Sequence, residues 1–435
     1  MNDHQLAAHV AVGGRLRALL LELWQRTRMD WGFVTDRLAT TFRKETWIGA
    51  HERRFVSETL YGLVRHLRRI DLGLERGRRV KKPPRDLERL LALLVLERLV
   101  EPAHAGRLEP GVDWAAVAGV DHAIAGERKP SRRIALAASL PDWLAELLVA
   151  DWGDEAEALA LALNQRAPMT VRANLLVTDR DALAAELAAE RLDTHPGRWT
   201  DTALIIDSRT NLFASAAFKR GAMEAQDEGS QLLAELAVPR ETKSLIVDYC
   251  AGAGGKTLAI AARLANRGRI VASDVDGKKL EELRRRARRA HVSNAQAIAL
   301  DRNGWPKDVE ALRGKADVVF VDAPCSGIGA LRRNPEARWR LREADIATFA
   351  ARQREIMTTA IALAAPGARV VYATCSLLAA ENEQVARSLS GVEPVALSEV
   401  LGDERAQALA REGAFTVSPH VHGTDGFYAR VLKRV

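Results

Sequence analysis

The first third of the chain has the hydrophobic spacing of α-helices. Apolar side chains recur at steps of three and four residues at Phe55, Leu60, Leu63, Val64 and Leu67, which places them on one helical face. The same spacing returns over residues 86–99, and no alternating run of β-branched residues occurs before residue 138. The pattern therefore predicts an all-α domain over residues 1–138.

The pattern changes in the next hundred residues. A helix is expected to end near Asn164, and the β-branched runs at 170–177 and 203–206 predict two strands. Residues 180–189 have helical spacing between those strands. Residues 139–235 are therefore expected to form a small α+β module.

The C-terminal 200 residues alternate between short apolar runs and amphipathic helices. Strands are expected at 244–248, 269–273, 295–300, 316–322, 368–373 and 427–432, and helices at 257–265, 278–290, 344–364 and 380–389. Such βαβα alternation favours a parallel, doubly wound sheet with helices on both faces, the α/β class.

The composition is that of an ordinary globular protein, with 47% hydrophobic and 28% charged residues. No apolar run approaches the roughly 18 residues of a membrane span, and we see no signal peptide, so a membrane association is not expected. Three cysteines without a C-x-x-C spacing argue against a disulfide framework and fit the reducing cytoplasm. His420 and His422 lack a third ligand, so no metal site is expected.

The charge favours an anionic partner. The net charge is +7 and the pI about 9.5. Residues 51–90 alone carry 12 basic and 6 acidic side chains, which points to nucleic acid, although arginine-rich composition is an equal explanation for any single arginine. The arginines at 284–289 are expected to form a solvated helix face, whereas those at 332–340 are better placed for phosphate contact.

All three cysteines follow predicted strands of the C-terminal sheet. In doubly wound folds, ligands bind beyond the carboxyl ends of the strands. For Cys250 a buried, unreactive side chain is the better interpretation. For Cys325 and Cys375 this position favours a catalytic role.

A glycine-rich loop follows the first of these strands, and three interpretations compete for it. A P-loop needs glycine where Cys250 stands, and a dinucleotide fingerprint needs glycine where Thr257 stands. The third interpretation is the adenosyl-cofactor loop of a class I methyltransferase. Asp274, at the end of the next strand, supports it as a ribose ligand, but could also be a helix N-cap. The candidate cofactor-binding residues of this loop are Cys250, Ala251, Gly252, Ala253, Gly254, Gly255 and Lys256.

Several motifs resemble those of one enzyme family. The stretches Asp322-Ala-Pro-Cys-Ser-Gly327 and Ala373-Thr-Cys-Ser376, the latter followed by Glu381-Asn-Glu383, look like the two cysteine motifs of the RNA cytosine-C5 methyltransferases. Residues 57–65 are similar to the NusB-like RNA-binding helices of the family's RsmB-like branch, and residues 170–174 and 226–231 resemble its middle module. The family loop usually reads C-A-A-P-G-G-K, and here Gly252 and Ala253 replace its second Ala and its Pro.

The resemblance implies a domain organisation and an activity. Residues 1–138 would be a NusB-like RNA-binding domain, 139–235 an RNA-binding or linker module, and 236–435 a Rossmann-like class I methyltransferase domain. S-adenosyl-L-methionine (SAM) would be the cofactor and 16S ribosomal RNA the partner. The same chemistry on tRNA or 23S rRNA is the nearest alternative. A P-loop ATPase and a non-catalytic RNA-binding assembly factor are more distant ones, and no protein partner is implied.

The resemblance also implies residue roles. Cys375 would attack carbon 6 of the cytosine, and Cys325 would assist product release. Asp322 would hydrogen-bond either the base or the cofactor, and Asp301 would contact the adenine end of SAM. The role of Lys256 stays open. A helix expected to begin near Ala380 would help Cys375 to ionise.

Overall fold

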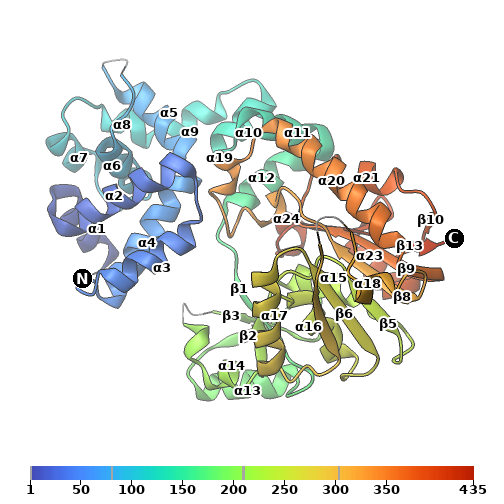
Figure 1. Cartoon of the computed structure of the whole chain (residues 1–435). Coiled ribbons are helices and arrows are strands. Elements are labelled where there is room, and N and C mark those ends of the chain that lie inside the picture. The colour runs from blue at the N-terminus through green and yellow to red at the C-terminus, as the bar shows by residue number, and fades with distance from the viewer. Residues whose placement is uncertain (1, 80–81, 208–210, 302–303) are drawn as a thin grey trace. The chain divides into compact units, whose positions relative to one another are not determined.

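The computed structural model describes residues 2–79, 82–207, 211–301 and 304–435 (Figure 1). Its contacts divide the chain into two compact units, each built from two segments. Unit 1 comprises Met1–Arg166 and Leu331–Glu343, and unit 2 comprises Ala167–Ala330 and Ala344–Val435. Within the described residues, no helix is both long enough and apolar enough to cross a membrane.

Unit 1 is helical throughout its described residues, as predicted for 1–138, apart from an isolated bridge between Arg78 and Val112. Its core is continuous and dominated by leucine, with Trp24 among its fully buried side chains. The helices are α1 (Asp3–Val12), α2 (Gly14–Asp30), α3 (Val34–Lys44), α4 (Ala50–Arg65), α5 (Leu67–Gly77), α6 (Asp86–Leu96), α7 (Pro102–Leu108), α8 (Trp114–Ala118), α9 (Val120–Ala125), α10 (Pro130–Ala137), α11 (Asp142–Trp152), η1 (Gly153–Glu155), α12 (Ala156–Asn164) and α19 (Ala337–Arg340).

Many arginines of the basic stretch in unit 1 are neutralised locally. Arg54 pairs with Asp3, Arg69 with Asp121, and Arg89 with Asp71. Ion-paired arginines offer less charge to a phosphate than the sequence count suggests, so the surplus of basic residues overstates the local field.

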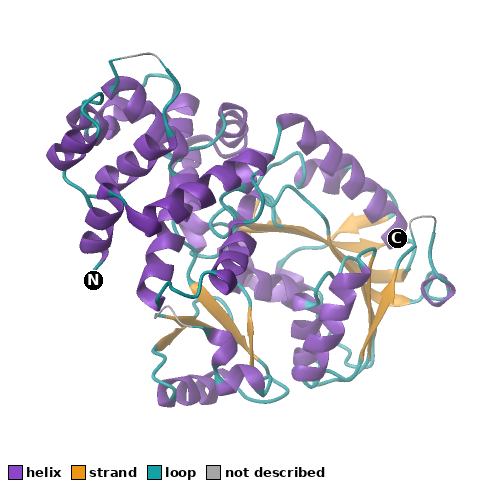
Figure 2. Cartoon of the chain, turned by 60° about the vertical axis from the view of Figure 1, so that its left-hand side comes forward, coloured by secondary structure: helices purple, strands orange, loops and turns teal. Residues whose placement is uncertain are grey.

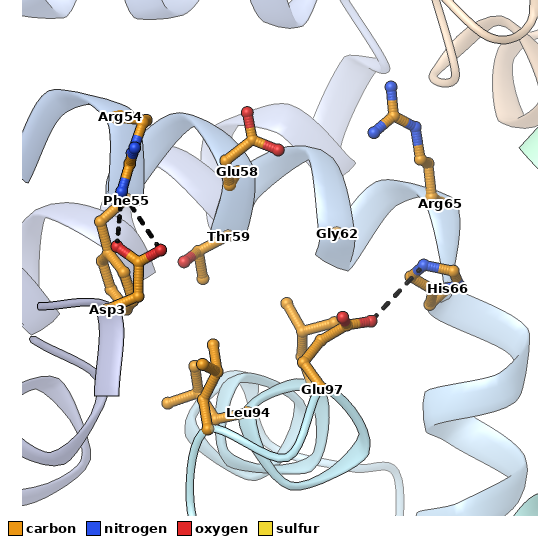
Figure 3. Close-up of a pocket in the computed structure, with 12 residues that line it drawn as sticks. Asp3, Arg54, Phe55, Glu58, Thr59, Gly62, Arg65, His66, Leu94 and Glu97 are labelled. Atoms are coloured by element: carbon orange, nitrogen blue, oxygen red, sulfur yellow. Dashed lines mark hydrogen bonds and ion pairs between the residues drawn. The ribbon is translucent and has the colours of Figure 1, made fainter. Parts of the chain in front are cut away.

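A pocket of about 180 Å3 in unit 1 is lined by α4 and the end of α6 (Figure 3). Arg54 and Asp3 pair at one side, and His66 lies 3.8 Å from Glu97 at the other. Burial lowers the pKa of His66 to about 4, so its ring is neutral at pH 7 and its contact with Glu97 is not an ion pair there. At neutral pH the Glu97 carboxylate therefore has no charged partner in His66.

Unit 2 begins with a four-stranded antiparallel sheet in the order β2-β3-β1-β4. The predicted helix 180–189 and strand 203–206 are confirmed, but the strand expected over 170–177 ends at Ala173, where the Asn174 side chain turns to bind the carbonyls of Gly221 and Ala290. The elements are β1 (Met169–Ala173), α13 (Arg180–Ala189), β2 (Thr194–Pro196), β3 (Ala203–Ile206), η2 (Leu212–Ala214), α14 (Ala216–Lys219), β4 (Met223–Ala225) and α15 (Glu228–Leu236).

The main sheet of unit 2 has the order β11-β12-β13-β9-β8-β5-β6-β7, with β10 paired to β13. Figure 2 draws the strands of the chain in orange and the helices in purple. The five strands from β9 to β7 are parallel, whereas β13 runs antiparallel to β9, which confirms the predicted α/β fold. Its elements are β5 (Leu245–Asp248), α16 (Gly255–Arg263), β6 (Arg269–Asp274), α17 (Gly277–Arg289), β7 (Ala295–Ala299), α18 (Lys307–Glu310), β8 (Ala316–Asp322), η3 (Ile328–Ala330), α20 (Glu343–Ile361), β9 (Ala364–Thr374), α21 (Glu383–Arg387), β10 (Val392–Pro394), α22 (Ser398–Leu401), α23 (Asp403–Leu409), β11 (Ala410–Arg411), β12 (Ala414–Val417), α24 (Pro419–His422) and β13 (Phe427–Arg434).

Successive residues of the parallel strands enter two different cores. Ile246, Val318 and Phe320 pack with α15 and α16 on one face. Their neighbours Val247 and Val319 pack with α20 on the other. Because strand side chains alternate in direction, a run apolar at every position marks a strand that is buried on both faces. Because helices cover both faces of the sheet, polar side chains of these strands lie at the strand ends.

Candidate active site

The carboxyl ends of β5, β8 and β9 lie side by side in unit 2. In register, Asp248 of β5 pairs with Phe320 of β8, and Asp322 of β8 pairs with Ala373 of β9. The chain order reverses between β5 and β8, since β6 and β7 lie on one side and β9 on the other. Such a switch point is where open α/β sheets bind ligands.

The two cysteines of the resembling motifs meet at this edge. Cys325 follows β8 and Cys375 directly follows β9, and their sulfur atoms are 3.2 Å apart. The hydrogen bond with Cys375 and burial raise the pKa of Cys325 well above its usual range. One thiol is therefore held as a proton donor beside the other.

Lys256 connects the glycine-rich loop to the cysteine side of the site. Its Nζ donates to Asp322 Oδ2 at 2.6 Å. Burial lowers the pKa of Lys256, but the charges of Asp322 and Cys375 outweigh that effect and raise it overall. Lys256 is therefore a positive charge held beside Asp322.

The loop itself is shaped by glycines and by backbone hydrogen bonds. Gly252 and Gly254 have φ values of +54° and +83°, a region that favours glycine, and a Cβ on Gly254 would lie 2.5 Å from Leu283. The N–H of Ala251 donates to the Ser273 carbonyl. Gly254 is the N-cap of α16 without any side-chain cap, so the first N–H groups of that helix are directed toward the space in front of the loop.

These residues fit a SAM molecule. The loop offers close backbone approach, and the partly exposed Asp274 stands at the end of β6, where a carboxylate can accept from hydroxyl groups. Asp274 accepts from the backbone N–H groups of Gly252 and Asp276. The alternative that it caps the following helix is wrong, because the N-cap of α17 is Asp276.

Two other predicted residues, Cys250 and Asp301, and the neighbouring Asp248 have distinct surroundings. Cys250 packs against the core behind β5, and burial raises its pKa. Asp301 is exposed just beyond β7 and forms an isolated bridge with Gly304. Asp248 is buried, and its Oδ2 accepts from Thr257 Oγ1 at 2.6 Å. Burial raises the pKa of Asp248 to about 7.

A buried carboxylate whose contacts the motifs do not reveal lies behind the cysteines. Glu381 has no exposed surface, and its oxygens accept from the Ser326 N–H, the Ser326 and Ser376 hydroxyls and the Gln353 amide. Ser326 and Ser376 each follow one of the cysteines. The position of Glu381 in a motif marked it as notable, but the sequence gives no means of finding its partners.

Three expectations about this region are wrong. The predicted helix near residue 380 is the five-residue α21, which begins at Glu383, so it gives Cys375 little support from a helix dipole. Arg338 is not available for phosphate, because it is fully buried and donates to the Ala138 carbonyl and to Asn164 within unit 1.

The third concerns the arginines of α17 and is wrong only in part. Arg285 and Arg288 are exposed, as a solvated helix face requires, but Arg286 and Arg289 both reach the buried Glu224 of β4. Arg286 also donates to the Ala253 carbonyl of the loop at 2.9 Å. A buried carboxylate draws these two long side chains inward, which a run of arginines in the sequence does not reveal.

The family models match two parts of the chain. Residues 235–433 match the model described as 16S rRNA methyltransferase RsmB/F, and residues 140–212 match the ferredoxin-like domain of RsmF/B-like methyltransferases. The chain is 32% identical over 415 residues to the probable ribosomal RNA small subunit methyltransferase B of Synechocystis sp., covering 88% of this chain and 91% of the relative. It is also 32% identical to ribosomal RNA small subunit methyltransferase B of Sodalis glossinidius, over 67% of this chain and 65% of that protein.

Solved structures share the fold. The crystal structure of PH0851 superposes with a TM-score of 0.75 at 24% identity, covering 95% of this chain and 97% of that one. The structure of NSun6 from Pyrococcus horikoshii with SFG gives a TM-score of 0.58 at 21% identity, over 68% of this chain and 98% of the other. These superpositions show that the fold of the chain is shared with known structures.

Proposed function

Because this chain belongs to the RsmB/F family of 16S rRNA methyltransferases and is a SAM-dependent RNA methyltransferase, we propose that it methylates carbon 5 of a cytosine in 16S ribosomal RNA. Membership of this family decides against the P-loop ATPase and against a non-catalytic assembly factor. The observation that carries the choice of cytosine C5 is the pair of thiols 3.2 Å apart at the ends of β8 and β9. Methyl transfer to an oxygen or an exocyclic nitrogen has no use for two cysteines, whereas carbon 5 of cytosine does.

The chemistry explains why a thiol is needed. Carbon 5 of cytosine is too weak a nucleophile to accept a methyl group directly. Addition of the Cys375 sulfur to carbon 6 forms an S–C6 bond and makes carbon 5 enamine-like and nucleophilic. When bound, SAM supplies an electrophilic methyl group on its sulfonium centre. The carbon-5 proton then leaves to a base, and the S–C6 bond breaks, which restores the aromatic ring and frees the thiolate.

The remaining residues would hold the reactants. Lys256, beside Asp322 and close enough to Cys375 to feel its charge, would stabilise the thiolate before attack and after release. Asp322 would hydrogen-bond the cytosine edge or the cofactor, and Cys325 would assist release. The loop Cys250–Lys256, with Asp274 and Asp301, would hold SAM. The cytosine would be unstacked so that sulfur can reach the face of its ring.

The other parts of the chain would bind the RNA. We assign residues 1–138 to a NusB-like RNA-binding domain, 139–235 to an RNA-binding or linker module, and 236–435 to catalysis. The contact boundary at Arg166 falls inside the second range, so these borders describe predicted roles rather than compact units. The reaction is placed in the cytoplasm, where bacterial ribosomal RNA is processed.

Nucleoside analysis tests the substrate and the product together. The purified protein would be incubated with SAM and with 16S rRNA, 23S rRNA or tRNA from a strain lacking the gene, and each RNA digested for mass spectrometry. We expect 5-methylcytidine in the 16S rRNA alone. If 5-methylcytidine appears only in 23S rRNA or tRNA, that RNA is the substrate and the 16S rRNA proposal is wrong. A different methylated nucleoside would refute the C5 proposal.

The assignment of the two cysteines has its own test. In Cys325→Ala, addition by Cys375 stays possible while release is impaired. A covalent protein–RNA adduct should therefore survive denaturing electrophoresis and disappear after RNase treatment. The matched control is Cys325→Ala/Cys375→Ala, which should form no adduct. Accumulation in Cys375→Ala instead would reverse the two roles.

A further inference from the structure

The two cysteine loops are joined by one buried carboxylate. Ser326, directly after Cys325, donates to Glu381 through both its backbone N–H (2.8 Å) and its hydroxyl (2.5 Å). The hydroxyl of Ser376, the residue directly after Cys375, donates to Glu381 Oε2 at 2.6 Å. The Ser326 hydroxyl donates to this oxygen as well. The residue that follows each cysteine is therefore hydrogen-bonded to the same carboxylate, that of Glu381.

The rest of the network strengthens this anchor. The Gln353 amide of α20 donates both to Glu381, at 3.1 Å, and to the Pro324 carbonyl, at 3.0 Å. Asn382 donates to the Ser376 carbonyl at 3.0 Å and accepts from Thr374 Oγ1 at 2.6 Å. Hydrogen bonds thus hold the residues on both sides of Cys375, and a further one holds Pro324 directly before Cys325.

Glu381 is held by neutral donors alone. Two arginines pair with the buried Glu224, whereas Glu381 has no ion-pair partner in the described part of the chain. A buried carboxylate without a countercharge is costly, and its four donors offset that cost only if all of them are in place. Displacing either loop would remove donors from the carboxylate, so the two loops stabilise each other's position through it.

We propose that Glu381 is a positioning residue that fixes the two cysteine loops relative to each other and so sets the separation of the two thiols. The proposal rests on the proposed function, in which both thiols act on one base in succession. A sulfur that attacks and a sulfur that assists release must reach the same ring without a large movement of either loop. Losing about 1 Å of such alignment costs on the order of 100-fold in rate.

A thiol cross-linking assay tests the geometry without any RNA. Diamide oxidises two neighbouring thiols to a disulfide while it is itself reduced, and peptide mass spectrometry would follow the Cys325–Cys375 bond at fixed pH. We expect rapid formation in the wild type and at least tenfold slower formation in Glu381→Ala. Ser376→Ala keeps the carboxylate but frees one loop from it, so it should also slow the reaction.

Two variants separate geometry from charge and from general damage. Glu381→Gln is isosteric: its amide oxygen can accept from the Ser326 N–H and Gln353, and its amide nitrogen can donate to both serine hydroxyls. It should therefore cross-link within about threefold of the wild-type rate. Glu383→Gln, two residues along in the same motif, should match the wild type and is the control. Glu381→Ala cross-linking as fast as the wild type, or a wild type that does not cross-link, would overturn the proposal.

Kinetics provide the second measurement. In Glu381→Ala, kcat should fall by about 100-fold, while the Kd for SAM and the KM for RNA stay within threefold. Glu381→Gln should recover most of that kcat. Equal losses in kcat and in SAM affinity would indicate general damage and refute a positioning role. If the wild type makes no 5-methylcytidine but the cross-linking rates behave as expected, the proposed function fails and the geometric coupling stands.

Discussion

The two sides of the site in unit 2 are built in different ways. On the cofactor side, the loop after β5 is held through its own backbone groups, which bind the Ser273 carbonyl, the Asp274 carboxylate and the Arg286 guanidinium. On the cysteine side, the loops are held by side chains that converge on Glu381. A site made from backbone tolerates a change of side chain, whereas a site made from side chains does not.

This difference explains the unusual loop sequence. The family pattern has Ala-Pro where this chain has Gly252 and Ala253. A residue before proline is disfavoured in helical conformations, and here no proline follows Gly252, which takes φ +54° instead. The backbone at Ala253 is held by a residue of α17, since Arg286 donates to the Ala253 carbonyl at 2.9 Å. In this chain the backbone of the loop is therefore held by its own contacts, with the Gly252 N–H on Asp274 and the Ala253 carbonyl on Arg286.

The largest effect is expected on the cysteine side alone. Cys375→Ala removes the proposed nucleophile, so methyl transfer should fall by about 1,000-fold or more. In the proposed mechanism the thiol contacts the base rather than the cofactor, so calorimetry should show a Kd for SAM within a few-fold of the wild type. Methyl incorporation into 16S rRNA is the measurement of activity. Near-normal incorporation in this variant would place the nucleophile elsewhere.

A variant of the Lys256–Asp322 pair should lower both the catalytic rate and the affinity for SAM. Lys256→Met leaves Asp322 without its 2.6 Å partner and removes the positive charge near Cys375. Losing a hydrogen bond between charged groups costs about 1.5–3 kcal/mol, so kcat should drop about 10- to 100-fold. The Kd for SAM should rise as well, since Lys256 stands in the first turn of α16. A fall in kcat with an unchanged Kd would confine Lys256 to the cysteine side.

The sequence predicts the strands of this site better than the contacts behind it. The central strands are apolar at consecutive positions and are bounded by turn residues, so β5, β6 and β8 are found within a residue or two. The three-residue strands β2, β4 and β10 are too short to show a period. Cysteines at strand ends already point to a common edge of the sheet.

Long-range contacts explain what the sequence does not reveal. The partners of Glu381 lie 55, 28 and 5 residues away, so no local pattern identifies them. Arg338 stands among other arginines in a stretch that looks basic and exposed, yet it is buried by residues that lie roughly 200 positions earlier. In both places a polar residue acts through tertiary contacts that folding alone brings together.

A smaller and one-sided effect is expected at Asp274. Asp274→Ala removes the proposed ribose acceptor and a partner of the Gly252 N–H, so SAM binding should weaken by about 1–3 kcal/mol. Isothermal calorimetry measures it. Asp276→Ala is the matched control, because it removes the N-cap of α17 and should lower helix stability while leaving the Kd for SAM unchanged. Equal affinities in the wild type and Asp274→Ala would remove Asp274 from the cofactor site.

A pH-dependent effect sharpens the contrast between the two buried carboxylates. Asp248 has one hydroxyl partner, whereas Glu381 has four donors, and burial raises the pKa of Asp248 to about 7 from an unfolded value of 3.8. Below about pH 4 this carboxyl is protonated in both the folded and the unfolded state. Between about pH 4 and 7 the unfolded chain releases the proton and the folded chain keeps it. The stability that Asp248 contributes therefore falls as the pH rises, by up to about 1.4 kcal/mol per pH unit, and is lost above about pH 7.

Asp248→Asn isolates that contribution. Asparagine can still accept from Thr257 and does not titrate, so the free energy of unfolding should depend less steeply on pH between 4 and 7 than in the wild type. Above pH 7 the free energy of unfolding should depend on pH in the same way in the two proteins, which serves as the internal control. Denaturant melts at half-unit pH steps would measure both slopes. Identical slopes below pH 7 would mean that the Asp248 carboxylate is already ionised in the folded protein, and that a single hydroxyl with a nearby lysine is enough to hold a buried charge where Glu381 uses four donors.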